Sequence, residues 1–117
     1  MRRSIKAAVA GATAATAMLV ATPGAALAYT ESCTVQNSRC STGNVTASAG
    51  HQVVVATYNV QGRSYELRVR DVTNNRIVFS TATSGQVYRT LSGVYATYSA
   101  EIACYNNCPG MMVALWN

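Results

Sequence analysis

The segment Ser64-Tyr65-Glu66-Leu67-Arg68-Val69-Arg70 alternates polar and apolar residues without a break. Successive side chains of a β-strand point to opposite faces, so this period places the apolar side chains on one face and the charged ones on the other. Residues 71–76 follow with turn chemistry, since Asn tolerates the left-handed backbone region. Ile77-Val78-Phe79 then returns as a β-branched, apolar run. Residues 63–83 therefore predict a half-buried antiparallel hairpin.

The first 28 residues have the pattern of a signal peptide. Three basic residues, Arg2, Arg3 and Lys6, precede the small-residue apolar run 7–20, and Ala26-Leu27-Ala28 forms an A-x-A cleavage signal. A membrane anchor is the alternative, but Pro23 and Gly24 end the apolar run short of the roughly 20 residues that a spanning helix needs. We expect cleavage after residue 28. Residues 29–117 would then form a single secreted, extracellular domain with no membrane segment.

The charge of the whole chain, +5, overstates that of this domain, because three of the nine basic residues lie in the signal. Six arginines then stand against four acidic residues, which leaves a formal net charge of +2 without any lysine. A nucleic-acid partner is therefore not expected. Four of the arginines lie on or beside the hairpin: Arg63, Arg68, Arg70 and Arg76. A solvated sheet face explains this cluster more simply than an anion site.

The rest of the chain contains short β-type segments separated by turn residues. We expect strands within residues 44–48, 51–60, 86–91, 94–105 and 111–116. A polar lead-in, residues 29–32, and a loop that ends at residue 43 precede them. The result is about seven strands, with turn signals every 8–12 residues and no helical pattern. This layout predicts an all-β fold, a small antiparallel β-sandwich that is immunoglobulin-like or jelly-roll-like. A small barrel is the alternative.

Four cysteines in a short exported chain predict two disulfides. Three pairings are possible, and we favour Cys33–Cys40 and Cys104–Cys108 because each pair flanks a short loop. Residues 105–107 are expected to form a hairpin connection that brings Cys104 and Cys108 face to face. Such small rings would shape loops at the sheet ends rather than join the sheets. A zinc site is disfavoured, because Cys33 and Cys40 lack the usual C-x₂₋₄-C spacing.

Groups for catalysis are few. His51 is the single histidine, and no G-x-S-x-G motif accompanies a possible combination of His51, Asp71 and a serine. Glu66 and Glu101 could form a glycosidase pair, but each is expected on the polar face of a strand. No Gly-rich phosphate loop is present. We therefore expect a non-enzymatic protein without metal or cofactor.

Seven tyrosines in a small domain indicate a binding surface. Tyr65 and Tyr98 are expected in the core, while the segment 105–112 is expected to be a rigid contact loop stapled by its disulfide. The candidate binding residues are Tyr88, Tyr95, Tyr105, Asn106, Asn107, Met111 and Met112.

The run from Ser92 to Ile102 into Cys104, the short cysteine rings and the Ala/Thr-rich signal resemble small secreted actinobacterial β-sandwich proteins. This group includes the adaptor subunits of umbrella toxin particles, and the resemblance implies a protein-binding adaptor in an extracellular toxin complex. An inhibitor of a secreted protein is a related possibility. A carbohydrate or cell-wall binding module that uses tyrosines as stacking platforms is the second hypothesis, and a free-standing antimicrobial or killer-type toxin is the third.

Overall fold

The computed structural model describes residues 29–117, so the predicted signal peptide lies outside the described residues. This part of the chain forms nine strands, all paired antiparallel. It contains no helix long and apolar enough to cross a membrane.

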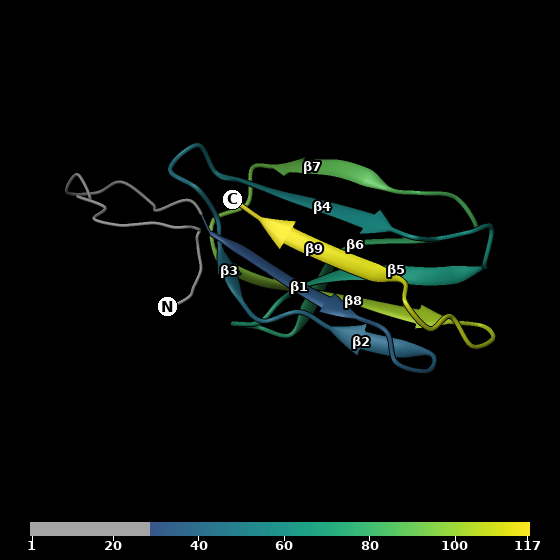
Figure 1. The fold of residues 1–117 in the computed structure, drawn as a ribbon. Helices are drawn as coiled ribbons and strands as arrows, with labels where there is room; N and C mark the ends of the chain where they lie inside the picture. Colours follow the sequence, from purple (N-terminus) through teal and green to yellow (C-terminus); the bar gives the residue numbers. More distant parts are fainter. Residues whose placement is uncertain (1–28) are drawn as a thin grey trace, which may run out of the picture.

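The strands form two sheets packed face to face, the predicted β-sandwich (Figure 1). The four-stranded sheet has the order β1 (Thr30–Thr34), β9 (Met112–Trp116), β4 (Gln52–Tyr58) and β7 (Tyr88–Ser92). The five-stranded sheet has the order β2 (Arg39–Ser41), β8 (Thr97–Cys104), β5 (Tyr65–Asp71) and β6 (Arg76–Thr83), with β3 (Val45–Thr46) also paired to β8.

The predicted hairpin is β5 and β6. Tyr65, Leu67 and Val69 are fully buried on its inner face, as the alternation predicts. They pack between the sheets with buried residues of β4, β8 and β9. The predicted apolar run lies at the start of β6, where Ile77 and Val78 are 42% and 43% exposed. β6 is the edge of its sheet, and a bulge beside Val69 places an extra residue in it.

The segment before the first predicted strand also differs from expectation. Residues 29–32 were expected as a lead-in, yet Thr30–Thr34 pairs along β9 through five residue pairs. The segment 44–48 shortens to the two residues of β3. A polar, threonine-rich segment can serve as an edge strand, because half of its side chains face water and the apolar partner strand provides the burial.

Both predicted disulfides are present, Cys33–Cys40 and Cys104–Cys108. Their settings are not those expected. Cys33 lies on β1 and Cys40 on β2, so this disulfide joins the two sheets instead of only shaping a loop. Residues 105–107 do not close a hairpin, because β8 and β9 lie in different sheets and the chain crosses between them.

Candidate binding surface

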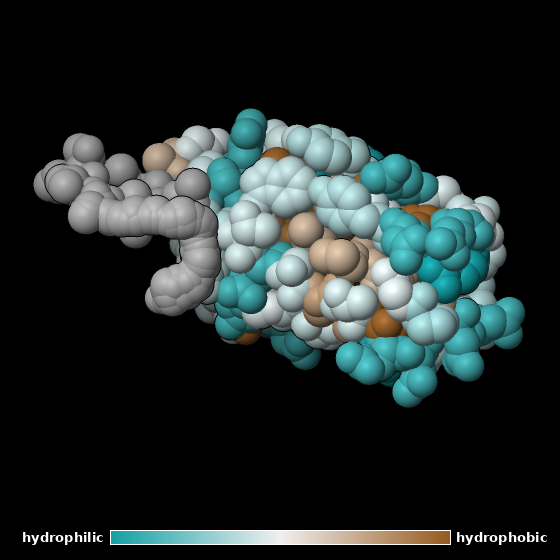
Figure 2. Space-filling view, in the orientation of Figure 1, coloured by the Kyte–Doolittle hydropathy of each residue, from teal (hydrophilic) through white to brown (hydrophobic). Residues whose placement is uncertain are grey.

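The outer face of the four-stranded sheet carries no charged side chain among the described residues. Val53, Val55, Val113 and Leu115 point inward and are fully buried, so their neighbours along the strands point outward. The outward residues, which we call the uncharged face, are Thr30, Ser32, Thr34, Gln52, Val54, Ala56, Tyr58, Tyr88, Thr90, Ser92, Met112, Ala114 and Trp116. Figure 2 shows this face toward the viewer, with brown and pale residues in its middle and the strongly hydrophilic ones mostly around its rim.

Three large rings stand on the uncharged face. Tyr88, on β7, is 68% exposed, and it packs edge-on against Trp116 of β9 with ring centroids 5.7 Å apart and an interplanar angle of 65°. Tyr58, at the end of β4, is 38% exposed and pairs along the backbone with Met112. Aromatic rings on an uncharged sheet provide contact area at little cost in side-chain entropy, and such rings are enriched at protein–protein interfaces.

The outer face of the five-stranded sheet is charged instead. Arg68 lies 2.8 Å from Glu66 and 3.7 Å from Glu101, and Arg70 lies 3.5 Å from Glu101. The hydrogen bond to Glu66 raises the pKa of Arg68. Glu66 and Glu101 share one arginine, so both carboxylates are held in ion pairs on a solvated face. Among the described residues, the two outer faces of the sandwich therefore differ in charge: one has no charged side chains and the other carries ion pairs.

The loop after β8 lies at one end of the sandwich. Tyr105 is 65% exposed there, and Asn106 and Asn107 line a shallow polar depression of about 250 Å³ with Gly62, Arg63 and Ser64. The guanidinium of Arg63 donates to three carbonyls, those of Val60, Pro109 and Asn59. Arg63 therefore connects the loop before β5 to the loop before β9. Its guanidinium hydrogen-bonds to these backbone carbonyls.

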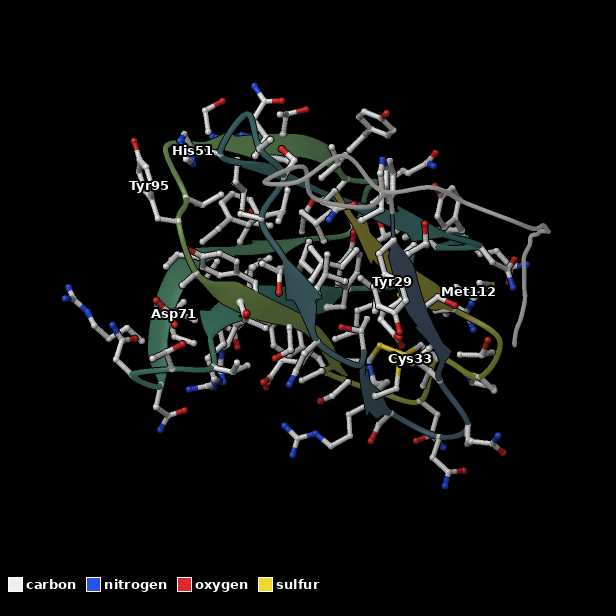
Figure 3. The ribbon with its side chains drawn as sticks, turned by 90° about the vertical axis from the view of Figure 1, so that its left-hand side faces the viewer. Tyr29, Cys33, His51, Asp71, Tyr95 and Met112 are labelled. Carbon is white, nitrogen blue, oxygen red and sulfur yellow. A yellow bond between two sulfur atoms is a disulfide. The ribbon has the colours of Figure 1, made fainter. Side chains whose placement is uncertain are left out.

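Tyr95 lies at the opposite end of β8, beside His51 (Figure 3). The two rings stack with centroids 4.1 Å apart and planes tilted by 31°. The hydroxyl of Tyr98 accepts hydrogen bonds from the backbone N–H groups of Tyr95 and Ala96, at 3.1 and 3.2 Å, which fixes this loop. Because the whole of β8 separates Tyr95 from Tyr105, the two tyrosines belong to different surfaces.

The predicted binding residues are thus distributed over four places. Tyr88 and Met112 lie on the uncharged face, and Tyr95 lies at one end of the sandwich. Tyr105, Asn106 and Asn107 lie at the other end, and Met111 is fully buried in the core. Met111 already belongs to the ladder with β1, through the hydrogen bond from the Val35 N–H to its carbonyl. Its side chain points inward for the same reason that Met112 points outward.

Tyr58, Trp116 and Val54 were not among the predicted binding residues. A signal for Trp116 exists in the sequence, because positions 112, 114 and 116 alternate with 111, 113 and 115. Both sets are apolar, so the pattern does not indicate which one faces water.

All four cysteines are in disulfides, and residues 29–117 contain no group of three His, Cys, Asp or Glu side chains that could hold a metal ion. No known protein-family model matches the chain, and no curated protein matches it. The candidate surface therefore rests on the geometry alone.

Proposed function

We propose that this protein is an exported, non-enzymatic binding module that docks another secreted protein through the uncharged face. The observation that carries the proposal is an entire sheet face without charge that presents Tyr58, Tyr88 and Trp116. Interface cores are depleted in charged residues and enriched in aromatic residues and methionine. The two disulfides support export, because the cytosol keeps thiols reduced.

An adaptor and an inhibitor are both consistent with this surface, because each needs a rigid scaffold with one protein-binding face. The Cys33–Cys40 bridge ties β1 to the opposite sheet and so holds the edge of the uncharged face in place. A preorganised surface loses less entropy on binding, which favours affinity.

Carbohydrate binding is the second candidate, and the relative orientation of two aromatic rings weighs against it. Sugar rings stack best on aromatic rings that lie flat in one plane, but the planes of Tyr88 and Trp116 are inclined at 65°. At most one of the two rings can lie flat against a planar polysaccharide surface. An edge-on pair suits the irregular surface of a protein better.

The test uses the secreted, oxidised protein as bait in culture supernatant of the producing strain. The double variant Tyr58→Ser/Tyr88→Ser should lose a stoichiometric protein partner that the unaltered protein recovers. Tyr95→Ser is the matched control, because Tyr95 is as exposed as Tyr88 but lies at the end of the sandwich. Recovery of no stoichiometric partner, or equal recovery by the double variant, would contradict the proposal.

Two further experiments test the alternatives. Retention on insoluble chitin, cellulose or peptidoglycan would favour carbohydrate binding. Killing of competing bacteria or yeast by the purified protein would favour the toxin hypothesis.

A further inference from the structure

Strand β6 is the least protected sheet edge in the part of the chain that the structure describes. It is eight residues long, whereas the edge strands β1, β2 and β7 have five, three and five residues. Natural edge strands are usually short, or carry lysine, proline or an inward-pointing charge that blocks a further strand. From Ile77 to Thr83 the strand has neither proline nor any charged residue. Its one irregularity, the bulge at Val78, lies near the start.

The hydrogen-bond pattern shows which backbone groups of β6 are free. The Tyr105 N–H donates to the Ser64 carbonyl, and the Val72 N–H donates to the Thr97 carbonyl. Even-numbered residues of β5 therefore bond to β8, and by alternation the odd-numbered ones bond to β6. Their partners on β6 are Phe79, Thr81 and Thr83.

The backbone N–H and C=O groups of Ser80 and Ala82 consequently point away from β5, toward the free edge of the sheet. Both residues are exposed. Beside them, Ile77 and Val78 leave a substantial part of their apolar surface in water. The edge thus offers main-chain donors and acceptors together with an apolar contact, the two elements that recognise an added strand.

The arginines beside this edge indicate the charge of the strand that would bind there. Arg76 begins β6, and the guanidinium carbon of Arg89, reaching over from β7, lies 4.9 Å from the centre of the Phe79 ring. Both arginines are exposed, and neither forms an ion pair within residues 29–117. The nearby carboxylate of Asp71 accepts a hydrogen bond from the Thr73 N–H. Two unpaired guanidinium groups flanking one edge favour a strand that carries carboxylates.

A second copy of this chain fits less well. Its own β6 contains no carboxylate, so pairing β6 with β6 would bring together additional copies of Arg76 and Arg89 without an opposite charge. Like charges held close together destabilise an interface.

We propose that the free edge of β6 binds an extended, acidic segment of a partner protein as an additional strand. Main-chain hydrogen bonds to Ser80 and Ala82 hold the segment, apolar side chains on it cover Ile77 and Val78, and its carboxylates pair with Arg76 and Arg89. This site is separate from the uncharged face and does not depend on it.

The probe is a random-peptide display library selected on the oxidised protein at low salt. Selected peptides should be enriched in Asp and Glu and in β-branched residues. Ser80→Pro and Ala82→Pro each remove an outward N–H that no strand of the protein uses, and edge strands tolerate proline at such positions. Each should weaken binding about fivefold, the effect of losing one main-chain hydrogen bond of about 1 kcal/mol. Thr90→Pro, at the edge of the other sheet, is the matched control and should bind normally.

Amide hydrogen exchange gives an independent readout. The amides of Ser80 and Ala82 should exchange fast in the free protein and slow on addition of a selected peptide, while those of Phe79 and Thr81 should be slow in both states. Arg76→Gln/Arg89→Gln should abolish the preference for acidic peptides, and Tyr58→Ser/Tyr88→Ser should leave peptide binding unchanged even if the uncharged face has no partner. Selection of no peptide or of peptides without acidic enrichment, full binding by both proline variants, or slow Ser80 and Ala82 amides in a self-associated dimer would overturn the proposal.

Discussion

The hydroxyl of Tyr65, on β5, lies 2.9 Å from the hydroxyl of Thr57, on β4 of the opposite sheet, and both residues are fully buried. Tyr65 donates to the carbonyl of Gly85 at 2.6 Å. Thr57 accepts from the N–H of Val87 at 2.9 Å, so its own O–H is free to donate to the Tyr65 oxygen. Both buried hydroxyls therefore have hydrogen-bond partners. This hydrogen-bond network connects the two sheets to each other and to the loop between β6 and β7.

Replacing Tyr65 by Phe should therefore destabilise the protein by about 1–3 kcal/mol, because the Gly85 carbonyl and the Thr57 hydroxyl lose their partner inside the sandwich. The measurement is urea unfolding followed by circular dichroism. Tyr88→Phe is the control, since its hydroxyl is on an exposed ring, and it should change stability by less than about 0.5 kcal/mol. Equal stabilities of the two variants would show that the buried hydrogen-bond network contributes nothing.

The same residue should make stability fall in alkaline solution. Burial raises the pKa of Tyr65 above its ordinary value of 10.0, and the hydrogen bond with Thr57 only partly opposes this. The folded protein then holds the phenolic proton more tightly than the unfolded chain, so this contribution is complete below pH 10 and is lost as the pH rises above it. Urea midpoints measured from about pH 9 to about pH 11 should decline less steeply in Tyr65→Phe. Tyr29→Phe should be tested beside it, because hydrogen bonding to Glu31 raises the pKa of Tyr29 as well.

Removal of the disulfide between the sheets, by Cys33→Ala/Cys40→Ala, should cost about 2.5 kcal/mol on the loop-entropy model. The smaller ring of Cys104–Cys108, whose cysteines are four positions apart instead of seven, should cost about 2 kcal/mol in the corresponding double variant. Urea unfolding under oxidising conditions measures both. Unaltered midpoints in the two variants would contradict the expectation, and the reduced protein serves as the reference for loss of both bridges.

Arg63→Met should loosen the loops at the Tyr105 end of the sandwich. Three backbone carbonyls lose the guanidinium that they share, and lysine cannot restore the arrangement because its ammonium is a single point of charge. Amide exchange in residues 59–62 and 108–110 should accelerate in both Arg63→Met and Arg63→Lys. Rescue by lysine would indicate that the charge alone matters.

Gly110→Ala should destabilise the protein by about 1–2 kcal/mol, because Gly110 has a φ of +87° and an added Cβ would lie 3.1 Å from the Asn59 amide nitrogen. Gly85→Ala is the matched control, since its Cβ would meet only an ordinary contact 3.7 Å from Thr83. Thermal unfolding should separate the two variants. A Gly110→Ala midpoint as high as that of Gly85→Ala would show that the turn relaxes without cost.

The hairpin, the sandwich and both cysteine pairings could be predicted from the sequence, because each depends on a local pattern. The alternation in residues 64–70 contrasts apolar with charged side chains, and each cysteine has a partner nearby in the chain. Strand β1 could not be predicted, since its polar residues become a strand only through pairing with β9, more than seventy residues away.

The candidate surface could be predicted only in part. The number of tyrosines predicts a binding surface, but the sequence does not show which of them share a face. In β4 and β9 both faces are largely apolar, so the alternation that orients β5 has no contrast there. The grouping of Tyr58, Tyr88 and Trp116 follows from the register of β4 with β7 and β9, which is a long-range property.

The bond between Cys33 and Cys40 also limits how molecules of this protein can exchange parts. β1 is an edge strand, the first of the strands that the structure describes, and its only strand partner is β9. Without the disulfide it could leave its own sheet and add to β9 of a neighbouring molecule. While the disulfide is intact, β1 remains covalently linked to β2 of the same molecule. In a domain-swapped dimer, β1 would have to reach the neighbouring molecule without breaking this link. Reduction would remove this restraint, and swapped species should accumulate first in thiol-containing solutions.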